Sequence, residues 1–304
     1  MKMMKKSVQL AALLFVLIAY ETSAQTTDAL RQKLQQIIST KNAVVGVSII
    51  ANNGKDTLSL HGNRHCPTQS VFKFHAALAV LDQIDKGKFS LDQKVAVQKK
   101  DLLPGFWSPL REENPDGGSF AISKLIQYAV SQSDNVACDA LLRLLGGPQV
   151  VEGYIRENGI KDISLKFNEE DMQAQWDNMF QNWTTPIAAS ETLRKFYDTG
   201  NQLLSPKSYA FIWRIMKETT TGEGRLKGLL PKGTIVAHKT GSSGTNKEGL
   251  TPATNDIGIV FLPNGNYFII SVFVANSTEN DQTNERIIAE IAKATWDHYA
   301  TAKK

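Results

Sequence analysis

The sequence predicts an α+β fold: an antiparallel sheet formed from both ends of the chain, flanked by helices, with an all-helical lobe inserted between its strands. Two observations support it. Segments rich in β-branched residues gather near the two ends of the 304-residue chain, and segments with helical periodicity fill the middle. We therefore expect residues 25–68 and 220–304 to form an α/β lobe and residues 69–219 an all-α lobe. The two lobes would form one structural unit with a functional site between them.

The amino-terminal part of the mature chain is predicted to form a helix followed by a hairpin. Asp28 to Ser39 carries its leucines and isoleucines on one stripe, as an amphipathic helix does. Val44 to Ile50 is β-branched, and Asn52-Asn53-Gly54 is a turn signal before a returning strand at Asp56 to Leu60. Val71 to Ile84 is apolar on almost every side, which indicates a buried helix.

The middle of the chain has mostly the apolar periodicity of helices, and the end has mostly the β-rich segments of strands. Five further helices are expected, at Ile122–Val130, Val136–Leu145, Gln149–Asn158, Pro186–Tyr197 and Pro206–Lys217. Phe167 to Trp183 is polar and acidic without a clean period, which predicts a long loop of the kind that often carries function. The end of the chain predicts three strands and a closing helix, at Thr234–His238, Asp256–Phe261, Tyr267–Ala275 and Glu285–Tyr299.

The first 24 residues have the pattern of a secretory signal peptide. Three lysines precede an apolar stretch from Val8 to Tyr20, and small residues follow up to Ala24, after which we expect cleavage. No cysteine lies at the cut and no later stretch is long and apolar enough to span a bilayer, so no membrane anchor is expected. The formal net charge of +4 gives no indication of a nucleic-acid partner.

The chain has two cysteines, Cys66 and Cys138. An exported protein with two cysteines can form a disulfide. Here one cysteine directly precedes a candidate motif and the other lies in an apolar helical segment, so we favour two buried free thiols and keep the disulfide as the alternative. His65-Cys66 is too small a cluster for a zinc site, and no metal is expected.

Ser70-Val71-Phe72-Lys73 places a hydroxyl and an amine three residues apart at the start of a predicted helix. Residues i and i+3 share a helix face, so the Lys73 amine is expected within hydrogen-bonding reach of the Ser70 hydroxyl. A serine hydroxyl becomes a good nucleophile when a neighbouring base takes its proton. Taken alone, the motif favours a simpler interpretation, a helix-capping serine beside a solvated lysine.

Two more polar triplets stand at the boundaries of predicted elements. Ser133-Asp134-Asn135 lies between two helices, 63 residues after Ser70, and Lys239-Thr240-Gly241 follows a strand, 106 residues after Ser133. Singly, they can be explained as a helix-capping turn and a strand exit. In this order, S-x-x-K, S-D-N and K-T-G form the signature of β-lactamases and penicillin-binding proteins.

Over essentially its whole mature length, the sequence resembles the class A serine β-lactamases. Residues 69–75, 133–139, 181–183 and 237–241 carry the resemblance, and they are most similar to the extended-spectrum branch that includes the PER and VEB enzymes. The resemblance implies a two-lobed β-lactamase/transpeptidase-like fold. It also implies an exported, periplasmic enzyme that hydrolyses penicillins and cephalosporins, the extended-spectrum ones included.

The motifs and the resemblance together assign the acylation groups. Ser70 would attack the lactam carbonyl, Lys73 would help to remove its proton, and Ser133 would relay a proton to the departing lactam nitrogen. The resemblance places the oxyanion hole at the backbone N–H groups of Ser70 and Ser242. Asn135 would orient Lys73 and hold the side-chain amide of the substrate.

The substrate carboxylate is expected at Lys239, Thr240 and Ser242. Many relatives add an arginine from the strand after K-T-G, where this chain has none; Arg225 matches the position at which the PER-like branch supplies it. A surface arginine is the alternative. Trp107 matches the aromatic residue at the lip of the cleft, and ordinary partial burial is its alternative.

Turnover needs a base that activates water against the acyl-enzyme. In the acidic cluster of the long loop, the family pattern E-x-x-[LM] selects Glu169, with Glu170 and Asp171 as alternatives. Gln173 stands where the family usually has an asparagine. The arginine that usually braces the loop is absent, so the path of the loop stays open.

Two other functions fit the three motifs. A penicillin-binding D-Ala-D-Ala peptidase or transpeptidase shares them but lacks a deacylation base, so Glu169 argues against it. A non-enzymatic β-lactam sensor domain would need a membrane segment, and the sequence shows none after the leader. We expect a small-molecule β-lactam substrate, no cofactor and a monomer.

Overall fold

The structure is a computed structural model that describes residues 27–300. The predicted leader at 1–24 therefore lies outside the described residues. Within them, no helix is both long enough and apolar enough to cross a membrane.

One five-stranded antiparallel sheet joins the two ends of the chain, as predicted. Its strand order is β2–β1–β10–β9–β8. The amino-terminal part of the chain supplies β1 (Val44–Ala51) and β2 (Asp56–Leu60). The carboxy-terminal part supplies β8 (Val236–Ser242), β9 (Thr251–Phe261) and β10 (Tyr267–Ser277). Along the central pair, Val44 lies opposite Ala275 and Ala51 opposite Phe268. The β-branched residues that predicted these strands fill both faces of the sheet.

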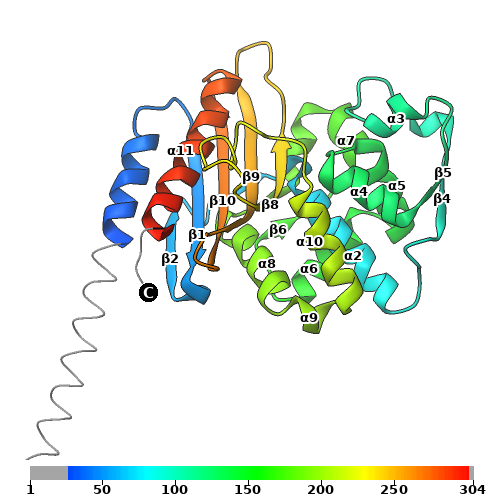
Figure 1. Cartoon of the computed structure of the whole chain (residues 1–304). Helices are drawn as coiled ribbons and strands as arrows, with labels where there is room; N and C mark the ends of the chain where they lie inside the picture. Colours follow the sequence, from blue (N-terminus) through cyan, green and yellow to red (C-terminus); the bar gives the residue numbers. More distant parts are fainter. Residues whose placement is uncertain (1–26, 301–304) are drawn as a thin grey trace, which may run out of the picture.

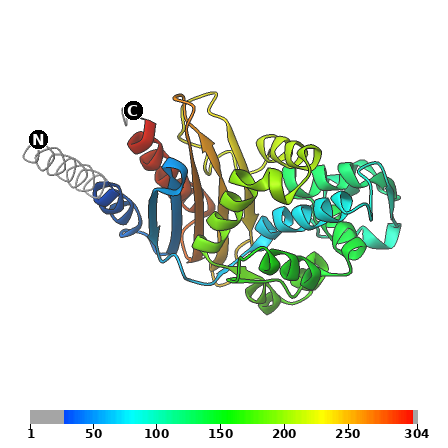
Figure 2. The same cartoon turned by 90° about the horizontal axis from the view of Figure 1, so that it is seen from below.

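The two faces of the sheet belong to two different hydrophobic cores. On one face, the helix at 27–38 and α11 (Asp281–Ala300) pack side by side, and their apolar residues join those of the sheet in one cluster (Figure 1). On the other face, α8 (Pro186–Asp198) packs against β1 and β10, and the remaining helices extend from there. Figure 2 shows the same order from below: terminal helices, sheet, helical part.

The helical part is built around α2 (Phe72–Asp85), whose residues from Phe72 to Asp82 are all buried. This agrees with its apolar character on every side. The helices around it and beyond it are α3 (Pro109–Glu113), α4 (Ile122–Ser131), α5 (Asn135–Leu145), α6 (Pro148–Glu157), α9 (Gly200–Leu203) and α10 (Pro206–Lys217). Helix boundaries match the predicted ones to within two residues wherever a helix was predicted in this part.

The structure differs from the prediction at the polar segments. The predicted loop Phe167–Trp183 contains α7 (Glu169–Ala174) and the 3-10 helix η4 (Trp176–Gln181), joined to the fold through β6 (Ile163–Ser164), β7 (Trp183–Thr184) and β3 (Cys66–Pro67). These helices are too short for a period to show in the sequence. The hairpin β4 (Lys94–Val97) and β5 (Gly118–Ala121) was not predicted, because its mixed polar residues show little alternation.

Candidate active site

Ser70 lies in the 3-10 helix η2 (Gln69–Val71) that leads into α2. The preceding residue, Gln69, has a backbone φ of +44°, in the left-handed region that residues other than glycine rarely adopt. Neighbouring elements hold this turn from both sides: the N–H of Thr68 donates to Asn182 O at 2.8 Å, and Asn255 Nδ2 donates to Pro67 O at 2.8 Å. Strain of this kind persists where the surroundings fix the backbone, and it is common beside reacting groups.

Strand β8 passes directly against η2 because Gly241 has no side chain. A Cβ at Gly241 would lie 2.7 Å from the backbone oxygen of Thr68 and 3.2 Å from Cβ of Gln69. The K-T-G glycine therefore permits a backbone approach that no other residue allows. As a result, the strand that ends at Ser242 runs beside the turn that carries Ser70.

The Lys73 amine is fully buried and joins three groups. Its Nζ donates to the backbone oxygen of Ser133 at 2.7 Å and to Oδ1 of Asn135 at 2.5 Å, and it lies 3.0 Å from Oε1 of Glu169. Among the described residues, none of its hydrogen bonds goes to the Ser70 hydroxyl, which differs from the expectation drawn from helix spacing. The Lys73 amine instead binds the S-D-N turn and the Glu169 carboxylate, which come from other elements. The spacing of Ser70 and Lys73 in one helix could not predict these partners.

Ser133 and Lys239 meet across the cleft. Lys239 Nζ donates to Ser133 Oγ at 2.9 Å and to Thr240 O at 2.8 Å. Burial, together with the Lys73 cation nearby, lowers the pKa of Lys239 well below its usual range. Ser133 itself has φ +60°, and Asp134 caps α5 by accepting from the N–H of Ala137 at 2.8 Å. The S-D-N turn is thus both a helix cap, its simpler interpretation, and part of the site.

Glu169 is the buried member of the acidic cluster, with 8% of its surface exposed, whereas Glu170 and Asp171 are exposed. It begins α7, and its N–H donates to Oδ1 of Asp139 at 2.8 Å. The N–H of Glu170 donates to Oδ2 of the same carboxylate at 3.0 Å. The backbone at the start of α7 is therefore held by both oxygens of Asp139, which points the Glu169 side chain at Lys73.

Asp139 is a functional residue that the sequence analysis missed. It lies in α5, four residues after Asn135, so both side chains share one helix face, and that spacing is the signal that could have found it. Burial first, and then the negative charge of Glu169, raises the pKa of Asp139 to about 7. The protonation of Asp139 thus depends on the charge of Glu169.

Asn182 is the second brace of the α7 segment, by which we mean residues 166–182 around α7. Its Oδ1 accepts from the N–H groups of Lys166 and Phe167 at 2.8 and 3.0 Å, and its Nδ2 donates to Phe167 O at 2.7 Å. Its own backbone oxygen accepts from Thr68, as described above. An uncharged amide therefore connects both ends of the segment to the turn of Ser70, in place of the arginine ion pair that the sequence lacks.

Arg225 is 8% exposed, which excludes a surface role. Its Nη2 donates to Ser242 Oγ at 2.7 Å, and its Nη1 donates to the backbone oxygens of Gly241 and Asn255 at 3.0 and 2.9 Å. Its Nε donates to Oε1 of Glu285 at 3.1 Å. The guanidinium lies along the end of β8 and brings positive charge to the cleft wall beside the Ser242 hydroxyl.

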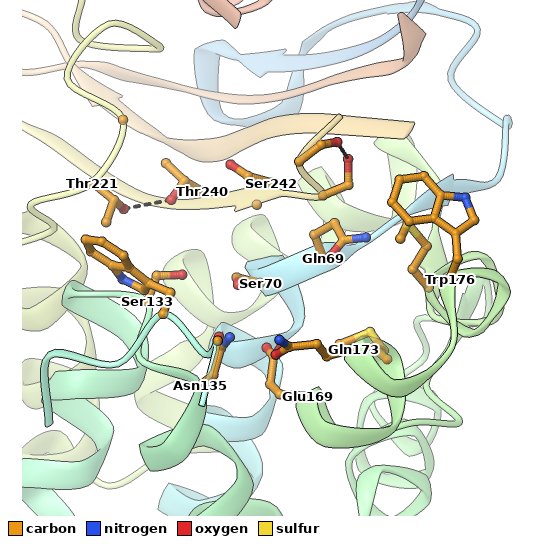
Figure 3. A pocket seen from close by; sticks show the side chains of 18 of the residues that line it. Gln69, Ser70, Ser133, Asn135, Glu169, Gln173, Trp176, Thr221, Thr240 and Ser242 are labelled. Atoms are coloured by element: carbon orange, nitrogen blue, oxygen red, sulfur yellow. Dashed lines mark hydrogen bonds between the residues drawn. The ribbon is translucent and has the colours of Figure 1, made fainter. Parts of the chain in front are cut away.

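One cavity of about 730 Å³ is lined by most of the predicted site residues, whereas the buried Lys73 and Lys239 do not line it. Figure 3 shows Ser70 at its centre, Asn135 and Glu169 below it, and Thr240 and Ser242 on the strand above it. Trp107 lines the cavity with 59% of its surface exposed, and its Nε1 donates to Gln132 O at 2.9 Å, which agrees with a position at the lip. Gln173 lines it from α7, with Nε2 only 2.9 Å from where a Cβ on Gly105 would lie.

Ten further residues that were not predicted as site residues also line the cavity. They come from η2, the loop before α3, α7 and η4, the turn after α10, and the end of β8 with the loop after it: Gln69, Gly105, Met172, Trp176, Met179, Thr221, Gly222, Gly241, Ser243 and Gly244. Of the other residues weighed from sequence, His75 is buried inside α2, and burial lowers its pKa to about 4. His238 is fully buried and its Nδ1 lies 2.9 Å from Asp256. Cys66 and Cys138 are buried free thiols, as favoured.

The chain matches known proteins over almost its full length. The model of the β-lactamase enzyme family matches residues 29–299. β-Lactamase VEB-1 of Pseudomonas aeruginosa is 50% identical over 299 residues, 98% of this chain and 99% of that protein. Extended-spectrum β-lactamase PER-1 of Pseudomonas aeruginosa is 44% identical over 279 residues, 91% of this chain and 89% of that protein.

Solved structures agree in fold. The crystal structure of TLA-3 extended-spectrum β-lactamase superposes with a TM-score of 0.88 at 48% identity, covering 90% of this chain and 100% of that one. A β-lactamase from Chitinophaga pinensis gives a TM-score of 0.86 at 46% identity, covering 88% of this chain and 98% of that one. With three sequence motifs, one sheet from both termini and full-length matches in agreement, the chain belongs to the class A serine β-lactamases.

Proposed function

We propose that this enzyme opens the β-lactam amide by acylation of Ser70 and releases the product by water that Glu169 activates. The observation that carries the proposal is the 3.0 Å contact between Glu169 Oε1 and Lys73 Nζ, because Glu169 lines the same cavity as Ser70. A carboxylate and an amine that share a proton can each act as the base for one of the two half-reactions. The cavity lies between the α/β lobe and the all-α lobe of our domain assignment.

In the first half-reaction, Ser70 Oγ forms a bond to the lactam carbonyl carbon while its proton passes to the Lys73–Glu169 pair. The ring C–N bond then breaks, and the nitrogen takes a proton from the Ser133 hydroxyl, which regains one from the Lys73–Glu169 pair. Ser133 Oγ accepts a hydrogen bond from Lys239 Nζ at 2.9 Å, so the lysine can stabilise the oxygen as its proton leaves. Asn135 holds Lys73 and, in our proposal, the side-chain amide of the substrate.

The charges that develop on the substrate have partners in the cavity. The backbone N–H groups of Ser70 and Ser242 would stabilise the carbonyl oxygen as it becomes negative, and each such donor contributes on the order of 3–4 kcal/mol. Lys239, Thr240, Ser242 and the buried Arg225 form the cationic wall for the substrate carboxylate. Since Arg225 donates to the Ser242 hydroxyl, that hydroxyl is free to donate its own proton onward to the carboxylate.

In the second half-reaction, Glu169 takes a proton from a water molecule that attacks the ester carbonyl, the Ser70 ester bond breaks, and the proton passes through the Glu169–Lys73 pair to Ser70 Oγ. Gln173 lies on the same helix, four residues on, and its amide is a candidate to hold that water. We extend the substrates to the extended-spectrum cephalosporins because PER-1 and TLA-3 are described as extended-spectrum β-lactamases and match 91% and 90% of this chain. We also propose that the enzyme is exported to the periplasm as a monomer after cleavage near Ala24.

The test replaces Glu169 with glutamine, which keeps the shape and removes the base. With a chromogenic cephalosporin, the wild type should give many turnovers. Glu169→Gln should give one rapid turnover per molecule and then slow by a factor of about 10²–10⁴. Intact-mass spectrometry should then find the Ser70 acyl adduct.

Glu170→Gln is the matched control, because Glu170 is the exposed neighbour on the same helix. It should retain nearly the wild-type rate. A stoichiometric burst without turnover in the wild type would instead support a penicillin-binding peptidase or a sensor. Full turnover in Glu169→Gln would move the base to Glu170 or Asp171.

A further inference from the structure

Trp176 is a large aromatic side chain that the fold does not use. It lies in η4 with 39% of its surface exposed, and it lines the catalytic cavity. Among residues 27–300, no hydrogen bond or ring contact is found for its indole. Exposed tryptophans contribute little to folding, so one placed on the wall of a cleft is a candidate for ligand contact.

The two ends of the cavity differ in chemistry. Figure 3 shows Ser133, Thr240 and Thr221 at one end and Gln69, Gln173 and Trp176 at the other, with Ser70 between them. The first end is cationic, since Lys239 lies behind Ser133. The second end has two neutral amides and an indole.

A penicillin or cephalosporin nucleus has its carboxylate and its acylamino group on opposite sides of the lactam carbonyl. When the carboxylate is at the cationic end and the carbonyl is at Ser70, the acylamino side chain must extend toward Trp176. Asn135, below Ser70 in Figure 3, is placed to hold the amide at the start of that side chain. The end of the side chain then reaches the indole.

We propose that Trp176 determines substrate specificity by stacking on a flat aromatic or heteroaromatic ring at the end of the acylamino side chain. The inference rests on the proposed function and adds the substrate class that the cleft prefers. Gln69 supplies a second observation at this end: its Nε2 is buried, has no hydrogen-bond partner among the described residues, and points to the Trp176 side in Figure 3. A ring with a hydrogen-bond acceptor satisfies both residues.

The contact exists before and during the reaction, so it acts as uniform binding and should appear in KM more than in kcat. An aromatic pair contributes about 0.5–1.5 kcal/mol beyond its buried area. The apolar area that the stacked ring buries adds to this contribution. Removal of the indole should therefore lower kcat/KM about tenfold for a substrate whose ring reaches Trp176.

The experiment compares two penicillins with the same nucleus. One is benzylpenicillin, and the other has an acetyl side chain that is too short to reach Trp176. Trp176→Ala should lower kcat/KM about tenfold for benzylpenicillin, mainly through KM, and less than twofold for the acetyl compound. Trp176→Phe should restore most of the preference, and Trp176→Leu should not, because leucine fills space without a ring face.

Phe180→Ala is the matched control. Phe180 lies on the same 3-10 helix with 38% of its surface exposed but does not line the cavity, so neither substrate should be affected. Equal losses for both penicillins in Trp176→Ala and in Trp176→Phe, or no loss in either, would overturn the inference. Absence of turnover of either penicillin by the wild type would contradict the proposed function instead.

Discussion

Gly241 shows how much of this site depends on a single missing side chain. The close approach of β8 to η2 leaves 2.7 Å between a Cβ at this position and the Thr68 oxygen, which is a backbone atom that cannot rotate away. Real Cβ contacts are longer, so a side chain here must separate the strand from the turn of Ser70. The effect starts at one residue, because Gly241 is the point at which β8 approaches the Thr68 oxygen.

We predict that Gly241→Ala lowers kcat/KM by at least 100-fold, since donors that stabilise the carbonyl oxygen contribute on the order of 3–4 kcal/mol each and would be displaced. The fold itself should survive, with a loss of about 1–3 kcal/mol in unfolding free energy from overpacking. Steady-state kinetics and urea denaturation measure the two effects.

Gly153→Ala is the control for a glycine-to-alanine change as such. Gly153 lies inside α6 with nothing within 4 Å of the added Cβ, so alanine should raise the unfolding free energy by about 0.5–1 kcal/mol and leave activity unchanged. Wild-type activity in Gly241→Ala would show that the strand and the turn can separate without cost to the reaction.

At the scale of elements, the α7 segment shows where sequence patterns stop being informative. Its acidic residues were visible, and the pattern E-x-x-[LM] selected the residue that is in fact buried, Glu169. Its conformation was not predictable, because it depends on Asp139 from α5 and on Asn182, which bind its backbone rather than its side chains. Side-chain acceptors that bind the backbone N–H groups of another segment leave no periodic pattern in the sequence of that segment.

The Asp139 brace predicts a pH dependence of stability. Folding raises the pKa of this carboxyl from 3.8 to about 7, so the folded enzyme keeps the proton to a higher pH than the unfolded chain. The contribution to stability is therefore complete below about pH 4 and is lost as the pH rises to about 7. The slope for one proton is up to about 1.4 kcal/mol per pH unit.

Asp139→Asn removes this titration and should flatten the pH dependence of the unfolding free energy over that range. It should also loosen α7, because an amide offers one acceptor where the carboxylate offers two. Urea denaturation at pH 5 and pH 7.5 measures the first effect, and proteolysis within α7 measures the second. Identical pH slopes for wild type and variant would contradict the assignment.

At the scale of the whole molecule, the sequence predicted the sheet, its construction from both termini and the helical part between. These features follow from strong periods and from strands long enough to show β-branched runs, such as Tyr267–Ser277. Nine of the eleven residues predicted for the site also line one cavity, among them Ser70, Ser133 and Glu169. The sequence did not predict the places of Asp139 and Trp176. Asp139 of α5 binds the start of α7, and Trp176 of η4 lines the cavity, and both positions arise only when separate elements pack together.

The thiols give a prediction for the whole molecule. Because Cys66 and Cys138 are buried and free, no covalent link supports the fold, and a reductant should leave the thermal midpoint unchanged. Both thiols should resist alkylation in the native enzyme and react quickly in urea, since burial raises their pKa. A lower midpoint in dithiothreitol would reveal a disulfide instead.

The turn after α10 connects the groups on the two sides of the cleft. Thr220 N–H donates to Ser131 O at 3.0 Å, and Thr219 Oγ1 donates to His238 O at 2.7 Å, so one short segment holds the chain near Ser133 and the chain before Lys239 at the same time. This fixes the spacing of Ser133 and Lys239 against breathing motions. The two groups of the proposed proton relay are thereby tied to each other by a segment that contains neither of them.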